Sequence, residues 1–74
     1  MTMKYPDCEV ELVGVDANAV AIFMKVAREL RKYLISTGVS REDATAEAEK
    51  FKEEATSGDY DNMLDTCYRW VTVT

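Results

Sequence analysis

Apolar residues between Asp16 and Ser36 recur at the spacing of an α-helix and cover an unusually wide arc. At 100° per residue they occupy about 200° of the circumference, roughly twice the stripe of an ordinary surface helix. We place Phe23 at the centre of this arc. The full set is Ala19, Val20, Ile22, Phe23, Met24, Val26, Ala27, Leu30, Tyr33 and Leu34. The pattern therefore predicts a helix that packs on more than one side.

Two other segments alternate with a period of two residues, which is typical of strands. In the first, from Cys8 to Val13, the apolar residues are separated by glutamates, and Gly14 ends the run. In the second, at the C-terminus, Val71 and Val73 alternate with threonines. We therefore expect one strand near each end of the chain.

Two further helices are predicted between the long helix and the last strand. The second helix runs from Ser40 to about Thr56 and has a narrow, alanine-lined stripe. Its apolar members are Ala44, Ala48, Phe51 and Ala55. Asp59 is expected to cap a short third helix, because aspartate accepts hydrogen bonds from free amides of a first turn. Tyr60, Met63, Leu64 and Cys67 share one face of that helix. By the same reasoning, Asp16 is the expected cap of the first helix, and Gly38 its expected end.

These elements predict a single α+β domain over residues 1–74, with residues 1–7 as a candidate flexible lead. The expected order is strand, helix, helix, helix, strand. We predict that the terminal strands pair antiparallel and pack on the long first helix. One flank of its arc, Val20, Met24 and Ala27, suits the alanine-lined second helix.

The other flank of the arc lacks assured cover and is the predicted partner surface, comprising Ile22, Val26 and Tyr33. Trp70 is a further interface candidate, since tryptophan is enriched in binding hot spots. It is equally a candidate for the largest core residue. A core this small rarely supplies more than about 3–5 kcal/mol without help, which favours a homo-oligomer, with a dimer as the simplest form.

Charge and composition narrow the classes of function. The net charge is −5, and the whole acidic excess lies in residues 40–74. This balance argues against a general nucleic-acid binder, which needs a phosphate-neutralising surface. The chain has no apolar run long enough for a membrane span and no secretory h-region. The two cysteines, Cys8 and Cys67, are expected to be buried, reduced thiols, which fits a cytoplasmic protein.

Catalytic and ligand-binding motifs are absent from the sequence. There is no histidine, no nucleophile paired with a base, and no glycine-rich phosphate loop. Asp59, Asp61 and Asp65 have the spacing of a calcium loop, but Leu64 and Trp70 occupy its essential glycine and glutamate positions. We therefore predict a protein that is not an enzyme and has no metal or cofactor.

Three stretches carry a resemblance to a known family: Val10–Ala19, Glu54–Leu64 and Cys67–Val71. Together they resemble a family of small, uncharacterised proteins encoded by phages and prophages. The most recognisable part is Ser-Gly-Asp-Tyr-Asp at residues 57–61, within the segment Ala-Thr-Ser-Gly-Asp-Tyr-Asp at residues 55–61. The chain departs from the family pattern at Ala17, where the family has glycine. The resemblance implies a mobile-element origin and a bacterial cytoplasm, but it implies no activity and no site.

The sequence leaves two hypotheses of function besides an enzyme, which no constellation of residues supports. The first is a small interaction protein that acts through contacts with itself and with a bacterial or phage protein. The alternative is an acidic decoy that imitates DNA and inhibits a host nuclease or DNA-binding protein. It depends on nine acidic residues between Glu42 and Asp65.

Overall fold

Three helices and two short strands build the chain, whose computed structural model describes residues 3–74. The order is the predicted one, and the α+β class is confirmed. The elements are β1 (Tyr5–Val10), α1 (Ala19–Ser36), α2 (Arg41–Ala55), α3 (Tyr60–Trp70) and β2 (Val71–Val73).

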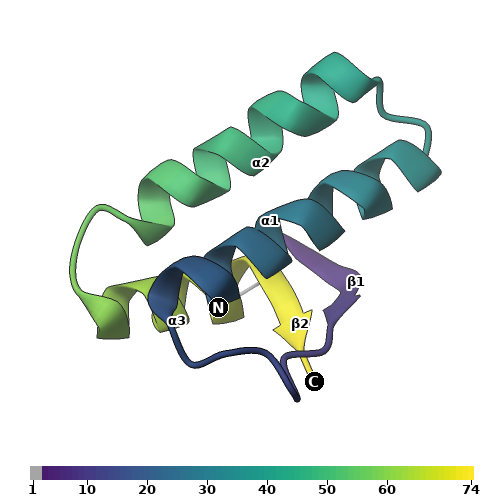
Figure 1. The fold of residues 1–74 in the computed structure, drawn as a ribbon. Helices are drawn as coiled ribbons and strands as arrows, with labels where there is room; N and C mark the ends of the chain where they lie inside the picture. Colours follow the sequence, from purple (N-terminus) through teal and green to yellow (C-terminus); the bar gives the residue numbers. More distant parts are fainter. Residues whose placement is uncertain (1–2) are drawn as a thin grey trace.

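The helices α1 and α2 lie side by side as an antiparallel pair joined by a short connection (Figure 1). Contacts from the rest of the chain reach both members of this pair. Tyr5 of β1 reaches Glu47 of α2, and Cys8 of β1 lies against the backbone of α1 at Glu29. Trp70 of α3 packs against Phe51 of α2. The molecule thus has an α1–α2 layer with α3, β1 and β2 on one side of it.

The two strands pair in parallel, so the predicted antiparallel pairing is wrong. The connections explain the direction. No loop separates α3 from β2, because Trp70 ends the helix and Val71 begins the strand. The strand therefore continues away from α3 without a tight turn and runs beside β1 in the same direction (Figure 1). The register is irregular between Tyr5 and Glu9, where the paired positions jump from Val71 to Thr72.

The predicted lengths of two elements also need correction. The strand β1 begins at Tyr5, three residues before the predicted start, and ends at Val10. Residues 5–7 of the candidate flexible lead therefore belong to the sheet, while residues 1 and 2 lie outside the described residues. The helix α1 has 18 residues, against 15 in α2, so it is not notably long.

Polar caps fix the starts of all three helices. The side chains of Asn18, Ser40 and Asp59 each accept a backbone hydrogen bond from the first turn. Asp59 is the predicted cap of α3, whereas the predicted cap Asp16 lies before α1 and accepts from the amide of Asn18. Gly38 follows the end of α1 with φ of 101°. The left-handed conformation at this residue suits glycine and lets the next amide bond back to Leu34.

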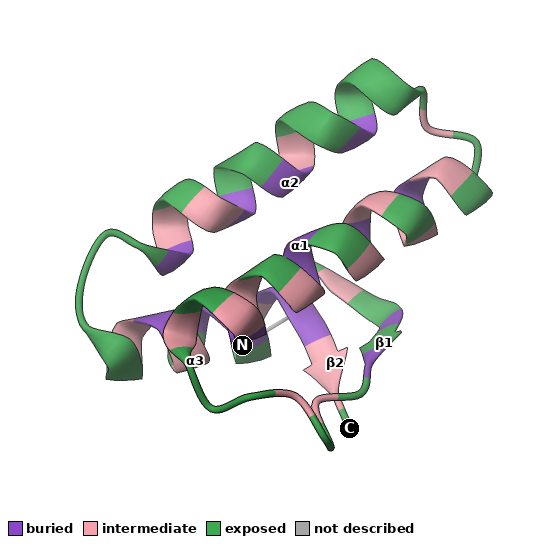
Figure 2. Cartoon of the chain, in the orientation of Figure 1, coloured by how far each residue is buried: buried purple, intermediate pink, exposed green. Residues whose placement is uncertain are grey.

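The core lies between the two layers, and its centre is not where the helical wheel placed it. Val26 and Leu30 of α1 are fully buried, whereas Phe23 is only partly buried near the start of the helix. The predicted stripe of α2 is confirmed in full, since Ala44, Ala48, Phe51 and Ala55 are all buried. In Figure 2 the buried positions of α2 lie along the side that faces α1.

Candidate interaction surface

The flank of α1 predicted as a partner surface is covered by this chain itself. Ile22 is 7% exposed and Val26 is fully buried. The ring of Tyr33 meets Tyr5 edge to face, with 6.4 Å between centroids. The thiol of Cys8 lies 4.0 Å from the carbonyl oxygen of Glu29. The first strand therefore covers this side of α1 at Tyr33 and Glu29.

Trp70, the fourth predicted interface residue, is 2% exposed and belongs to the core. Its ring lies 5.6 Å from that of Phe51 and 6.1 Å from that of Tyr5, measured between centroids. The ammonium of Lys4 lies over the same ring, 3.9 Å from its centroid. An indole capped by a cation gains a favourable electrostatic contact with the ring face. Trp70 thus joins α2, α3 and β1.

The opposite flank of α1 is the one left open. Val20 is 58% exposed and Met24 is 46% exposed. Both were expected to pack on the alanine stripe of α2, but only Ala27 of that flank is buried. Ala27 of α1 and Ala48 of α2 are both buried and line the same groove as Met24, so the small side chains lie at the helix contact while Met24 stays exposed. Two apolar side chains one helical turn apart are thereby exposed.

A shallow groove of about 260 Å³ follows the open flank between α1 and α2. Met24, Ala27 and Ala48 contribute apolar surface to it. Its polar side chains are Arg28, Arg31, Thr45, Glu49 and Lys52. Arg31 bridges the helices, because its Nε donates to the Thr45 hydroxyl over 3.0 Å. We call the side of the α1–α2 pair that carries this groove the outer face.

Opposite charges lie on the two helices of the outer face. At helical spacing, Lys25, Arg28 and Lys32 form one stripe along α1. Glu42, Glu49 and Glu53 form a corresponding stripe along α2. All but Lys25 are exposed, and Lys25 is half-buried. The outer face thus combines a basic stripe, an apolar seam with Val20 and Met24, and an acidic stripe.

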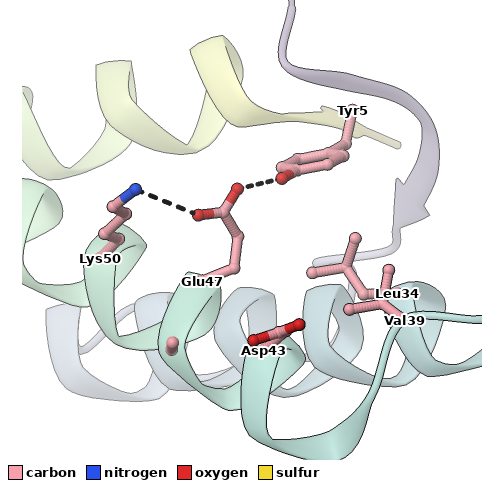
Figure 3. A pocket seen from close by; sticks show the side chains of 7 residues that line it. Tyr5, Leu34, Val39, Asp43, Glu47 and Lys50 are labelled. Carbon is pink, nitrogen blue, oxygen red and sulfur yellow. Dashed lines mark hydrogen bonds and ion pairs between the residues drawn. The ribbon is translucent and has the colours of Figure 1, made fainter.

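A second recess, of about 320 Å³, lies on the inner side of α2 and is closed at one end by Tyr5. Figure 3 shows the Tyr5 hydroxyl pointing at the Glu47 carboxylate, to which it donates a hydrogen bond. The other carboxylate oxygen of Glu47 lies 3.8 Å from the ammonium of Lys50. Burial and the neighbouring Glu47 raise the pKa of Tyr5 to about 12. The phenol therefore stays protonated near neutral pH and ties β1 to α2.

Both thiols are free and buried, as the sequence predicts. Burial raises the pKa of Cys8 to about 11, and the neighbouring Glu29 carboxylate adds to the effect. Burial likewise raises the pKa of Cys67 to about 11. Since the thiolate is the reactive form, these environments suit packing rather than nucleophilic chemistry.

Ion pairs engage several of the acids in the second half of the chain. Glu47 pairs with Lys50, and Glu49 pairs with Lys52. Arg69 of α3 holds Glu54 of α2 at 3.0 Å and also its neighbour Asp65. Four of the nine acids between Glu42 and Asp65 thus have a basic partner.

Within residues 3–74, no three histidine, cysteine, aspartate or glutamate side chains gather closely enough to hold a metal ion. None of the helices in this part of the chain combines the length and the apolar character needed to cross a membrane.

Comparison of this chain with models of protein families, with curated proteins and with solved structures gave no match.

Val20 and Met24 are the surface residues that reasoning from the sequence missed, although a local signal exists. On the wheel, Val20 and Met24 are the last two positions at one edge of the apolar arc, away from its centre. Met24 is 40° from Arg28, at about 100° per residue. An apolar position this close to solvated charges is a candidate for exposure.

Proposed function

We propose that this chain is a small, non-enzymatic interaction protein of phage or prophage origin that acts through protein–protein contacts of its outer face. The exposure of Val20 and Met24 carries the proposal. The chain buries or partly buries the rest of the apolar arc of α1, so these two side chains are the exposed part of the arc. An exposed apolar strip bordered by charges is typical of a surface that binds another protein.

The origin depends on the resemblance of residues 55–61 and their flanking segments to the phage and prophage family. A bacterial or phage protein in the bacterial cytoplasm is the corresponding setting for a partner.

The charge pattern favours protein contact over imitation of DNA. A DNA mimic presents unneutralised carboxylates in a row. Here basic side chains pair with Glu47, Glu49, Glu54 and Asp65, and the outer face carries both signs of charge. The acidic decoy therefore has no specific observation in its favour.

Site-specific photo-cross-linking tests the proposed function. A photoreactive residue at position 24 reports on the outer face, and the matched control is position 68. Tyr68 is 57% exposed on α3, away from the outer face. We expect discrete cross-linked protein adducts from position 24 and none from position 68. Equal yields at the two positions, or no adduct at either, would contradict the proposal.

A further inference from the structure

The two charged stripes of the outer face lie at matching levels along the helix pair. The Arg31–Thr45 hydrogen bond fixes which residues of α1 and α2 are level. Counted from this contact, Arg28 lies three residues toward the N-terminus of α1, and Glu49 lies four residues toward the C-terminus of α2. Since α1 and α2 are antiparallel, these two positions agree to one residue, or about 1.5 Å of helix rise.

The other two charged positions of each stripe also match. Lys25 lies six residues back along α1, and Glu53 lies eight residues forward along α2. Lys32 lies one residue forward of the reference contact, and Glu42 lies three residues before it on α2. Both pairs agree to two residues, or about 3 Å along the axis. Every base of the stripe is therefore level with an acid of the other stripe.

These charges do not neutralise one another across the α1–α2 pair of a single copy. Lys25 and Lys32 pair with Glu29 on their own helix, and Glu49 pairs with Lys52. Among residues 3–74, Arg28, Glu42 and Glu53 take part in no ion pair. Within this described part of one copy, three of the six stripe charges are therefore unpaired, and Lys32 and Glu49 stay exposed beside the partners on their own helices.

We propose that the outer face binds the outer face of a second copy of this chain, about a two-fold axis that runs parallel to α1 and α2. Such an axis places α1 of each copy over α2 of the other and keeps every residue at its own level. Arg28 then meets Glu49 of the partner subunit, and the other two levels match in the same way. The inference rests on the proposed function, because it names the partner of the same surface.

The alternative two-fold axis, perpendicular to the helices, would stack α1 on α1. That arrangement sets the basic stripe against itself and the acidic stripe against itself, which is unfavourable. Charge therefore selects the parallel axis. The same axis passes along the groove, so the two Met24 side chains face one another over Ala27 and Ala48.

The expected interface is small. Helices of 18 and 15 residues are about 27 and 22 Å long, and two helices side by side are about 20 Å wide. The contact then buries about 500 Å² on each copy, or about 1,000 Å² in total, near the lower limit for a specific interface. We accordingly expect a weak dimer that dissociates in the micromolar range.

Charge reversal combined with sedimentation equilibrium of the purified chain, up to about 1 mM, tests the dimer. In Arg28→Glu, both copies of the Arg28–Glu49 contact become repulsive. We expect the dissociation constant of the dimer to rise at least about tenfold. The double variant Arg28→Glu, Glu49→Arg restores both contacts and should recover the dimer. Lys50→Glu is the matched control, because it makes the same charge change on an exposed residue outside the stripes and should have little effect.

Circular dichroism of each variant verifies that the exposed substitutions leave the fold intact. A chain that stays monomeric at every concentration would overturn the dimer, as would a dimer that Arg28→Glu and Lys50→Glu weaken equally. The proposed function fails separately. If the chain is monomeric but position 24 still cross-links to a different protein, the proposed interaction function stands and only the proposed dimer fails.

Discussion

Ile22 and Val20 lie two residues apart on α1, yet the first is 7% exposed and the second 58% exposed. Their flanks are equally apolar in sequence. They differ in what the rest of the chain places against them. Tyr5 and Cys8 of β1 contact the Ile22 side of α1 at Tyr33 and Glu29. The other flank borders a shallow groove, to which α2 contributes Ala48 together with polar side chains. Apolar character predicts that a helix face needs cover, but the neighbouring elements decide which flank receives it.

The largest expected effect comes from placing a charge on each flank in turn. Ile22→Asp buries a carboxylate without a partner, and we expect a loss of at least about 4 kcal/mol, which is enough to unfold so small a domain. Val20→Asp places the same group in water and should change stability by no more than about 0.5 kcal/mol. Urea unfolding followed by circular dichroism measures both. A folded Ile22→Asp variant would mean that the two flanks do not differ in burial.

Truncation of two phenylalanines tests the position of the core centre. Phe51 is fully buried against Trp70, so Phe51→Ala should cost about 3–5 kcal/mol. Phe23 is partly buried near the start of α1, and Phe23→Ala should cost about 1–1.5 kcal/mol. The ratio of the two losses, taken from the same urea titrations, is the deciding quantity. Equal losses would restore Phe23 to the centre of the core.

Local patterns predicted most of the fold correctly, because their causes are local. The alanine stripe of α2 and the cap Asp59 depend on residues within one or two helical turns. Even the misplaced cap of α1 is off by only two residues, since Asp16 and Asn18 both accept backbone hydrogen bonds there. Helical periodicity and capping chemistry are sufficient for such features.

The errors concern contacts between residues far apart in the sequence. The direction of β2 depends on its direct continuation from α3, which no pattern in Val71–Val73 encodes. The cover of the Ile22 flank depends on Tyr5 and Cys8, and Tyr5 lies in a segment that lacks clear alternation. The two charged stripes of the outer face lie on different helices. Only the packing of α1 against α2 brings them side by side, so neither helix pattern predicts the face by itself. The sequence analysis therefore named a flank that the fold buries at Ile22 and Val26, and it did not name the exposed flank of Val20 and Met24.

The smallest expected effect is the loss of stability at alkaline pH that arises from the two buried thiols. Cys8 lies against α1, and Cys67 lies in α3. Each folded thiol has a pKa of about 11, against about 9 for an exposed thiol. Between these values the unfolded chain releases protons that the folded chain retains, so stability falls as pH rises. The contribution is fully present below about pH 9 and is lost progressively toward pH 11.

The free energy of unfolding from urea titrations at several pH values measures this decline, and the variant Cys8→Ala, Cys67→Ala is its control. Both substitutions remove a titrating group, so the variant should lose the part of the slope that begins near pH 9. Tyr5, with its pKa raised from 10 to about 12, should keep its own decline at higher pH in both proteins. Identical slopes in the two proteins between pH 9 and 10 would show that the thiols are solvated, and the Ile22 flank would then lack the cover assigned to β1.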